Sequence, residues 1–573
     1  MRLRSVAIKN FRALVNVTVE LDEATVLIGE NNTGKTSFLD ALRICLSQGM
    51  SRRGDLFDDY DHHLASNGAQ VGDAGDTEVV LRFAEAATDE WPDEIVQAIT
   101  EAIVFDGDLK QVVLRVRSTK DPNTGDMIAR WDFLDANGNA LKPKRPVGVV
   151  LRDLQQLKPF FYVSAVRDAL REFQPRSAFW GPFLRNPAIS DDMRKELEAE
   201  LDALNAKVIA ADTKLGDVKK RLEKTGEIVS IQTADAVTIE AVPGKARDLL
   251  SRAQITVSGR TGAKLPMARH GAGTQSLSVL FLFEAFLTSM LERIYGPGSV
   301  PIVAVEEPEA HLHPSAARTL WAAISALPGQ KIIATHSGDL LARVPLENIR
   351  RFCHESGGIK VRKLTPGVLD EEDLRKIGLH VRASRGELLF ARAWLLVEGA
   401  TEHWIMTGLA DILELDLDRL GVRLVPYAQV WPSPLLHLAN ELGIEWFCLA
   451  DGDSAGQKYK KAAIEALGGR TEAEHVLALP ESTIEVHLCE AGFSAPYVAN
   501  ISDQKKAQIT LTPGTTGYWD QVCRAQSSAK AKETLAQEVV EAVRAQGKAA
   551  VPSVLRGALD AVVRLAGGTA GAR

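Results

Sequence analysis

The sequence has little cysteine and no long apolar run. Its 573 residues include 5 cysteines, which lie far apart and form no CxxC pair. This spacing argues against a disulfide scaffold or a zinc ribbon and is typical of a protein in a reducing cytoplasm, where we expect this one. The start, MRLRSVAIKNF, alternates in polarity and does not resemble a signal peptide. The longest apolar candidate, LSVLFLFEAFL, contains Glu284 and is too short for a membrane span, so we expect no membrane partner.

An excess of positive charge is also missing. The chain has 67 Lys and Arg against 75 Asp and Glu, a net charge of −8. Any contact with nucleic acid must therefore come from local basic patches. Hydrophobic residues make up 45% and charged residues 25%, which excludes a mainly disordered or fibrous chain. At about 150 residues per domain, the length predicts about three or four structural units.

The first third of the chain contains strand patterns and one helical seam. Residues 1–35 alternate in polarity in two runs, which predicts strands ending in a glycine-rich turn. Further strands are expected at 77–83, 111–117, 130–134 and 160–166. Between 193 and 225, apolar residues recur in alternating steps of 4 and 3, which indicates either an amphipathic helix on a core or, as we favour, a helical arm that pairs with another helix or another subunit. The seam consists of Leu197, Leu201, Leu204, Val208, Ala211, Leu215, Val218 and Leu222.

The rest of the chain alternates strands with helices. Residues 255–345 contain the apolar strands IVAVEEPE and KIIATHS. After residue 385, the segments WLLVEG, RLVPYAQV, WFCLADGD and HVLALP are separated by helical stretches, which predicts a small parallel sheet. We therefore expect four segments: 1–185, 186–235, 236–384 and 385–573.

A phosphate-binding loop is the first strong motif. Gly29 to Thr36 forms a full GxxxxGK[ST] pattern, which follows an apolar strand and opens a helix. Glycines let backbone N–H groups wrap phosphates, Lys35 reaches the β and γ oxygens, and Thr36 ligates Mg²⁺. The predicted ATP-binding residues of this loop are Gly29, Asn31, Asn32, Gly34, Lys35, Thr36 and Ser37.

A second acidic element accompanies this loop. Glu306 and Glu307 end an apolar strand, where one carboxylate can hold Mg²⁺ and the next can polarise the attacking water. His336 ends the following strand and is placed to contact a γ-phosphate. A solvated acidic loop and a structural histidine are the alternatives. Between these elements, Gly271, Gly273 and Gln275 open a long apolar helix, whose backbone amides are suited to an anion.

The last third carries its own acidic cluster. Glu398 ends a strand and Glu402 follows one helical turn later, while Asp451 and Asp453 follow another strand. Four carboxylates at the ends of parallel strands form an oxygen-only site suited to Mg²⁺ or Mn²⁺. A solvated acidic loop with a helix cap is the alternative.

These motifs resemble a known arrangement. NFRAL, GENNTGKTS, RHGAGTQS, VEEPEAHLHP and ATHS, in that order, resemble the ABC/SMC-type ATPase heads of the RecF and OLD group, and VEGATE with ADGDSAG resembles a Toprim domain. A head with a helical insert followed by Toprim is the layout of the OLD (overcoming lysogenization defect) family, and the nuclease of Gabija antiviral systems is similar. The resemblance implies an α/β fold: an ABC/RecF-like ATPase head with an inserted helical dimerisation arm, followed by a Toprim parallel-sheet domain.

For the head, the resemblance implies ATP-bridged dimerisation. Glu306 then matches the metal-side acid, which is usually Asp, and Glu307 the general base. His336 matches the switch histidine. Gly271, Gly273 and Gln275 belong to the signature segment that contacts the nucleotide of a second subunit.

For the Toprim domain, the resemblance implies metal ligands and a basic residue. Glu398, Glu402, Asp451 and Asp453 match the family's metal-binding acids. Glu485 is the preferred further ligand, with Glu481 in reserve. The candidate for the family's basic residue is Lys548, which would stabilise charge on the scissile phosphate.

The predicted activity is an ATP-regulated, metal-dependent DNA endonuclease, with two metal ions about 4 Å apart, in phage defence or DNA repair. The alternative is an SMC/RecF-like DNA-repair scaffold with a non-catalytic Toprim domain. Expected partners are DNA, a second copy of the chain or more, and a possible separate helicase. Candidate DNA-contacting cations are Arg167, Arg171, Arg176, Arg185, Lys458, Lys460 and Lys461.

Overall fold

The structure is a computed structural model. It describes residues 1–47, 56–66, 68–69, 75–121, 123–164, 177–185, 189–212, 214, 217–218, 239, 241–243, 245, 253, 255–258, 264–355, 357–384, 386–526 and 532–567. In these residues no helix is both long and apolar enough to cross a membrane.

An antiparallel sheet is formed by the amino-terminal part of the chain. Its strand order is β2-β1-β4-β6-β5, with β7 also paired to β6. The first polarity run is a hairpin rather than one strand, because the chain turns at Arg12, whose φ is 49°. The other predicted strands of this region are confirmed. The elements are β1 (Arg2–Phe11), β2 (Leu14–Glu20), β4 (Thr77–Ala84), β5 (Ile103–Asp106), β6 (Leu109–Lys120), β7 (Met127–Phe133), α2 (Asp93–Ile99) and α3 (Val147–Leu157).

A second sheet lies beside it, in the order β14-β13-β3-β12-β11-β8. All neighbours are parallel except β14, which is antiparallel to β13. Because β3 and β11 both flank β12, the turns after these strands meet at one edge of the sheet. The elements are β3 (Ala24–Gly29), β8 (Phe160–Ser164), β11 (Ile302–Glu306), β12 (Gln330–Ala334), β13 (Ile349–Glu355), β14 (Gly358–Arg362), α1 (Lys35–Leu46), α5 (Trp180–Arg185), α9 (Ala272–Ser289), α10 (Leu291–Tyr295), α11 (Pro314–Ser325) and α12 (Gly338–Leu341).

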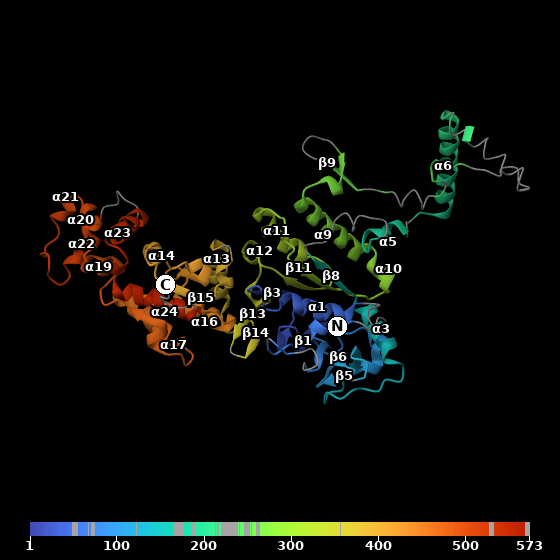
Figure 1. The fold of residues 1–573 in the computed structure, drawn as a ribbon, viewed down its shortest axis with the longest axis horizontal. Coiled ribbons are helices and arrows are strands. Elements are labelled where there is room, and N and C mark those ends of the chain that lie inside the picture. The colour runs from blue at the N-terminus through green and yellow to red at the C-terminus, as the bar shows by residue number, and fades with distance from the viewer. Residues whose placement is uncertain are drawn as a thin grey trace, which may run out of the picture.

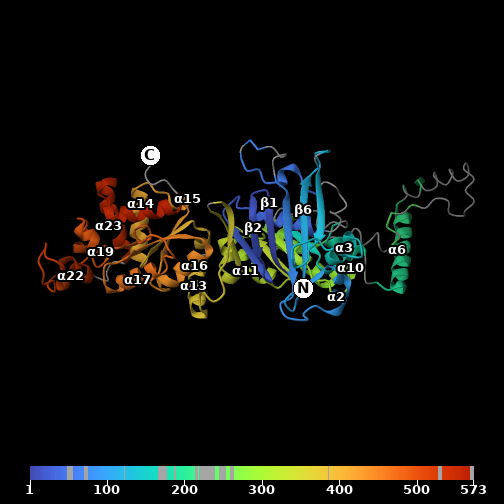
Figure 2. The same cartoon turned by 90° about the horizontal axis from the view of Figure 1, so that it is seen from below.

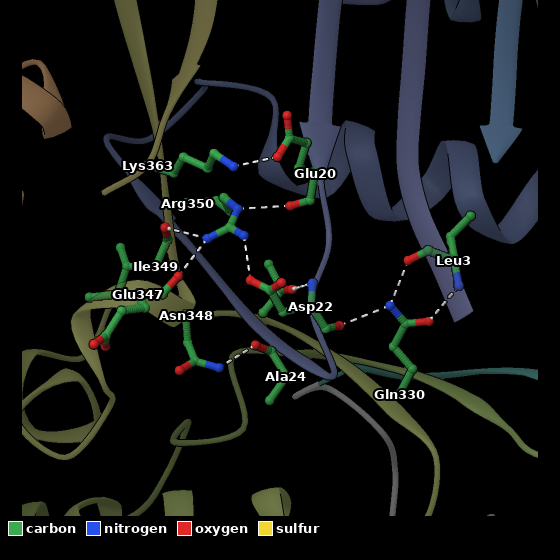
Figure 3. Close-up of polar contacts among 11 residues, drawn as sticks. Leu3, Glu20, Asp22, Ala24, Gln330, Glu347, Asn348, Ile349, Arg350 and Lys363 are labelled. Atoms are coloured by element: carbon green, nitrogen blue, oxygen red, sulfur yellow. Dashed lines mark hydrogen bonds and ion pairs between the residues drawn. The ribbon is translucent and has the colours of Figure 1, made fainter. Parts of the chain in front are cut away.

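Two buried polar side chains join these sheets (Figure 3). The Gln330 amide donates to the carbonyls of Leu3 (2.7 Å) and Asp22 (2.9 Å), and its oxygen accepts the Leu3 N–H. The Arg350 guanidinium, which is 3% exposed, donates to the Glu20 carbonyl and pairs with Asp22 at 2.6 Å. Since these groups are satisfied by one another, the amino-terminal sheet is fixed on the sheet that holds the phosphate-binding loop.

The predicted helical seam begins as expected. Helix α6 (Asp191–Ala211) starts at Ser190, whose hydroxyl accepts the N–H of Met193. Leu201 is buried, whereas Leu204 is 48% exposed, so α6 does not lie along a core. Both views place α6 at the end of the molecule opposite the C-terminal helices (Figures 1 and 2). The predicted seam residues Leu215 and Leu222 lie outside the described residues.

The carboxyl-terminal part contains the predicted small parallel sheet, in the order β16-β15-β17-β18. The parallel pairing confirms the expected sheet type. Its strands are β15 (Ala393–Val397), β16 (Val422–Pro426), β17 (Glu445–Ala450) and β18 (Val476–Ala478). Its helices are α13 (Glu371–Ala383), α14 (Ala400–Ile412), α16 (Pro432–Leu442), α17 (Ser454–Glu465), α19 (Ile484–Glu490), α20 (Ala495–Ala499), α21 (Asp503–Lys506), α22 (Tyr518–Arg524), α23 (Lys532–Gln546) and α24 (Ser553–Leu565).

One hydrophobic cluster runs across the junction of these two regions. It contains Ile28 and Phe283 from the second sheet and its helices, and Trp394, Tyr427 and Trp446 from the carboxyl-terminal sheet. Burying large aromatic side chains from both regions in one core stabilises them as a single unit.

A buried arginine adds hydrogen bonds to this junction. Arg351 on β13 is 4% exposed and donates to the carbonyls of Ala391 (2.7 Å), Leu442 (3.0 Å) and Gly443 (2.9 Å). Its neighbour Phe352 pairs in register with Gly29, the first residue of the phosphate-binding loop. Strand β13 therefore contacts both the loop and the segments that lead into β15 and β17 of the carboxyl-terminal sheet.

Candidate active sites

The phosphate-binding loop has the expected strand–turn–helix context. Gly29 has φ +146°, and a Cβ there would lie 2.3 Å from the Phe352 carbonyl oxygen, so a side chain is excluded. Gly34 precedes α1 with φ 87°, a left-handed conformation that favours glycine. The Lys35 ammonium donates to the carbonyls of Gly29 (2.9 Å) and Glu30 (2.7 Å). Burial lowers the pKa of Lys35 to about 8.

The other loop residues surround this lysine. Asn32 is left-handed at φ 64°, Asn31 and Asn32 are exposed at the turn, and Thr36 and Ser37 lie in the first turn of α1. A cavity of about 680 Å³ beside the loop is lined by Gly29, Asn31 and His336, together with Arg392 and Arg423 from the carboxyl-terminal region.

Glu306 comes to the loop from the end of β11. Its carboxylate accepts the Thr36 hydroxyl at 2.5 Å and the hydroxyl of Tyr162 on β8. The structure thus brings together the two residues predicted to hold Mg²⁺. Burial and the bond to Glu306 raise the pKa of Tyr162. Sequence reasoning missed Tyr162, because an aromatic residue in an apolar strand carries no signal of a polar role.

Glu307 directly follows β11, and His336 lies two residues after the end of the neighbouring strand β12. Glu307 has φ 45°, an uncommon left-handed conformation for a non-glycine residue, and its N–H donates to the Ala334 carbonyl at 2.8 Å. Packing around its ring, followed by the Lys35 charge, lowers the pKa of His336. Glu309 was missed: it accepts the His336 N–H at 3.1 Å and the Thr335 hydroxyl at 2.7 Å, and burial raises its pKa.

The predicted signature residues lie at the start of α9. Gly271 is the residue before the helix, and a Cβ on Gly273 would lie 2.7 Å from the His311 carbonyl oxygen. The Gln275 amide donates to the His270 carbonyl at 2.7 Å. These partners belong to the segments around 270 and 311, so the structure does not bring the signature residues to the loop of the same chain.

The acidic residues of the carboxyl-terminal region come from three turns. Glu398 follows β15 directly, and Glu402 lies in the first turn of α14, where it accepts the Gly399 N–H at 2.8 Å. Asp451 follows β17, and Asp453 caps α17 by accepting the N–H groups of Ala455 and Gly456. Parallel strands end at one edge of the sheet, and that geometry gathers these groups.

Two glycines allow the turn between Asp451 and Asp453 to close. A Cβ on Gly452 would lie 2.2 Å from the Glu481 carbonyl oxygen, and one on Gly456 would lie 2.0 Å from the Asp451 carbonyl oxygen. Both clashes are with backbone, which cannot move aside cheaply. The two glycines of DGDSAG are therefore required by the tight path of the chain.

Charge repulsion and burial mark this cluster. Burial raises the pKa of Asp451 to about 8, with the charges of Glu402, Glu398, Glu485 and Asp453 adding to the effect. Burial and then Glu485 raise the pKa of Glu402 to about 7. Burial, Asp453 and Glu485 raise the pKa of Glu398. Like charges that each oppose the ionisation of the others form a site that favours a cation.

The donor set fits a hard divalent cation. One Glu398 oxygen, Oε2, is buried without a hydrogen-bond partner, and all of the groups offer oxygen only, as Mg²⁺ and Mn²⁺ prefer. In the part of the chain that the structure describes, no three His, Cys, Asp or Glu side chains lie close enough together to hold a metal ion as they stand, so a cation would have to draw these carboxylates closer.

The choice between Glu481 and Glu485 has a structural basis. Glu485 lies in the first turn of α19, and its charge acts on Glu398, Glu402 and Asp451. Glu481 instead pairs with His487 at 2.5 Å. The structure thus brings Glu485, and not the carboxylate of Glu481, into the cluster.

Lys548 is not brought to this cluster. Its ammonium pairs with Glu414 at 2.6 Å, beyond the carboxyl end of α14, whereas Glu402 lies in the first turn of that helix. At about 1.5 Å per residue the two ends are roughly 18 Å apart. Lys532 on α23 lines one cavity with Asp453 and Glu485. The role predicted for Lys548 stays a prediction, and the distance along the chain could not show which lysine the fold brings to the cavity beside the acidic residues.

The candidate DNA-contacting cations are mostly paired or undescribed. Lys460 pairs with Glu472 at 3.1 Å and Lys461 with Glu465 at 4.0 Å, while Lys458 is exposed on α17. Arg167, Arg171 and Arg176 lie outside the described residues, as does the side chain of Arg185.

An ion pair connects the two sites' regions. The Arg392 guanidinium, just before β15, holds both carboxylate oxygens of Glu30 in the phosphate-binding loop, at 2.5 and 2.9 Å. The bond to Arg392 lowers the pKa of Glu30. A bidentate pair of this kind fixes orientation as well as distance.

The fold and these two sites define the class: an α/β head with a mostly parallel sheet and a GxxxxGK[ST] loop, followed by a parallel-sheet domain that matches an OLD-like Toprim model, in agreement with the expected fold class. The family model described as "Protein of unknown function (DUF2813)" matches residues 1–387, and the chain belongs to that family. A second model, "Overcoming lysogenization defect protein-like, TOPRIM domain", matches residues 389–453.

Relatives match over most of their length. YbjD of Escherichia coli K12 is 28% identical over 579 residues, covering 100% of both chains. The OLD nuclease of Thermus scotoductus is 27% identical over 445 residues, covering 73% of this chain and 75% of that one. Endonuclease GajA of Bacillus cereus is 22% identical over 480 residues, covering 82% and 78%. The resemblance to the OLD family is thereby confirmed.

Proposed function

We propose that the chain is a metal-dependent DNA endonuclease whose activity is regulated by ATP bound to its head. The observation that carries the proposal is the gathering of Glu398, Glu402, Asp451, Asp453 and Glu485 at one sheet edge, where burial and mutual repulsion raise the pKa of three of them. Relatives over most of the chain that are named OLD nuclease and endonuclease support the same activity.

The five carboxylates would hold Mg²⁺ or Mn²⁺, which supplies activation of water and neutralisation of phosphate charge. The chain's own groups do the rest. Asp453 is held in place by its two N–H donors, so its position is set before substrate arrives. Lys532 lies across the same cavity and is placed to offset charge on the scissile phosphate.

In the head, Lys35 and Thr36 would bind ATP and Mg²⁺ by exchanging partners. The Lys35 ammonium would leave two carbonyls for phosphate oxygens, and the Thr36 hydroxyl would leave Glu306. Glu307 is the proposed general base and His336 the proposed γ-phosphate contact. Gly271, Gly273 and Gln275 would complete the site of a second copy of the chain, so we propose a homodimer or higher assembly, with α6 as its arm.

The test is cleavage of supercoiled plasmid with Mg²⁺, Mn²⁺ or EDTA, each with and without ATP. We expect metal-dependent nicking that Asp451→Asn lacks, and ATP hydrolysis that this variant keeps. Asp411→Asn is the matched control, because Asp411 is exposed at the far end of α14 from Glu402. Equal cleavage by Asp451→Asn would overturn the assignment of the site. ATP hydrolysis without cleavage under any condition would favour the SMC/RecF-like scaffold.

By resemblance, we propose phage defence or DNA repair as the setting.

A further inference from the structure

A cavity of about 550 Å³ lies between the carboxylate cluster and the C-terminal helices. Its volume is in the range of small-molecule sites. Asp453 and Glu485 line it from the sheet edge, and three cations line it from the helices. These cations are Lys505 on α21, Arg524 on α22 and Lys532 on α23. The cavity is therefore acidic on its metal side and basic on the other.

The cations are available to an anion. Arg524 and Lys532 are exposed, and neither forms an ion pair with any described carboxylate. Lys505 donates to the Gln526 carbonyl at 2.5 Å, which positions its ammonium without neutralising its charge. The third acid of the lining, Asp520, accepts the Ser482 hydroxyl. The basic side is thus suited to a phosphate group.

The interior of the cavity has a different character. Tyr497 on α20 lines it while being only 1% exposed, and its hydroxyl has no hydrogen-bond partner. Such a buried donor is costly unless a ligand satisfies it. Val486, Leu535 and Ala536 give the same cavity an apolar wall. A phosphate alone would leave both the apolar wall and the tyrosine hydroxyl unused.

We propose that this cavity binds one nucleotide of the cut DNA strand in an extrahelical position, next to the scissile phosphate, a proposal that rests on the endonuclease function above. The phosphate of that nucleotide lies against Lys505 and Arg524, and its base enters between the apolar wall and the Tyr497 hydroxyl. In a paired duplex the bases are stacked inside, so a base reaches a buried tyrosine only by leaving the stack. Unstacking and unpairing cost a few kcal/mol, and the cost is least for a nucleotide that is already unpaired.

The proposal predicts substrate preference. We compare kcat/KM for a paired duplex with that for a duplex of the same sequence with one unpaired nucleotide, in Mg²⁺. Because each 1.4 kcal/mol corresponds to a factor of about ten, the unpaired substrate is expected to be cut at least about tenfold more efficiently. Equal efficiency would overturn the proposal.

Variants assign the preference to the cavity. Tyr497→Phe removes only the unpartnered hydroxyl, so the fold is kept, and the preference for the unpaired substrate is expected to fall several-fold. Arg524→Gln is expected to raise KM for both substrates with little change in kcat. Arg544→Gln is the matched control, because Arg544 pairs with Glu541 on the exposed side of α23 and does not line the cavity. A full preference in Tyr497→Phe would contradict base entry.

The two proposals fail in different ways. Cleavage retained by Asp451→Asn would remove the endonuclease assignment itself. Cleavage lost in Asp451→Asn, with wild-type protein cutting paired and unpaired substrates equally, would leave the endonuclease and remove only the extrahelical nucleotide. A uniform rise in KM in Arg524→Gln without any preference in wild-type protein would show that the cavity binds backbone phosphate alone.

Discussion

The two acidic sites of this molecule differ in how their charged side chains are paired. In the head, each charged group of the loop is satisfied from within: Lys35 by two carbonyls, Glu306 by two hydroxyls, and Glu30 by Arg392. At the Toprim edge, Glu398 keeps a buried oxygen without a partner, and burial followed by repulsion from neighbouring carboxylates raises the pKa of Asp451.

The difference shows what each site must do on binding a ligand. If the head binds ATP as proposed, it has to break internal hydrogen bonds before phosphate can replace them, so its ligand competes with the protein itself. At the Toprim edge, Glu402 and Asp453 accept backbone N–H groups, but the Oε2 atom of Glu398 has no partner, and a cation there would relieve repulsion that is already present. On ligand binding, the head would therefore exchange one set of hydrogen-bond partners for another, whereas the Toprim edge would gain a cation.

The largest expected effect is the loss of ATP hydrolysis when the charge of Lys35 is removed from the head. Lys35→Ala removes the ammonium that neutralises nucleotide phosphates, so ATP hydrolysis should fall by at least about 10²-fold. Metal-dependent cleavage without ATP should be unchanged, because Lys35 contacts only loop groups. Phosphate release from ATP and plasmid nicking measure the two. Lys360→Ala, an exposed residue of β14, is the control, and hydrolysis retained in Lys35→Ala would contradict the loop's role.

The sequence could predict local features of both sites but not contacts between residues far apart in the chain. A strand, a glycine-rich turn and a helix are local, so Gly29 to Ser37 could be placed from pattern alone. Carboxylates that end parallel strands could also be grouped, because such strands end at one edge. Tyr162 and Arg392 could not be found, since their partners lie 144 and 362 residues away in the chain. That Lys532 and not Lys548 lines the cavity could not be found for the same reason, because it depends on the packing of α23 against α14.

The second prediction tests which lysine assists cleavage at the Toprim site. Lys532→Ala should lower kcat for cleavage by about 10- to 100-fold, because a positioned charge beside the metal-binding acids is lost. Lys548→Ala should leave kcat unchanged, since its exposed pair with Glu414 is remote from the cluster. Single-turnover cleavage of labelled duplex measures both. The reverse ranking would restore Lys548 and contradict the placement of the C-terminal helices.

The third prediction concerns stability and pH. The pKa of Asp451 is raised to about 8 and that of Glu402 to about 7, from ordinary values of 3.8 and 4.5. The folded state therefore keeps protons that the unfolded state has lost, so in EDTA stability is greatest below about pH 4 to 5 with respect to these groups and falls as pH rises to 8. We expect a loss of several kcal/mol between pH 5 and 8, up to about 6 kcal/mol where the two shifts act independently.

Denaturant unfolding followed by the fluorescence of the buried Trp394 and Trp446 measures this loss. Asp451→Asn should be more stable than wild-type protein at pH 8 in EDTA, and saturating Mg²⁺ should remove most of the difference. A wild-type protein that is equally stable at both pH values in EDTA would contradict the picture of repelling carboxylates. No comparable dependence on Mg²⁺ alone is expected from the head site, whose Glu306 is already held by Thr36 and Tyr162.

The smallest expected effect tests whether the two sites act on each other. Arg392 stands directly before the strand that ends in Glu398, and its partner Glu30 belongs to the phosphate-binding loop. A change in the loop on the proposed ATP binding would therefore be transmitted to the Toprim sheet at the end opposite its carboxylates.

Arg392→Gln removes the charge but keeps a polar side chain. A partly exposed pair contributes about 0.2 to 1 kcal/mol, so the ratio of cleavage with ATP to cleavage without ATP should move about 1.5- to 5-fold towards one. Lys363→Gln breaks a pair with Glu20 that lies within the head and should leave that ratio unchanged. An unchanged ratio in Arg392→Gln would assign the coupling to Arg351 and the shared core instead.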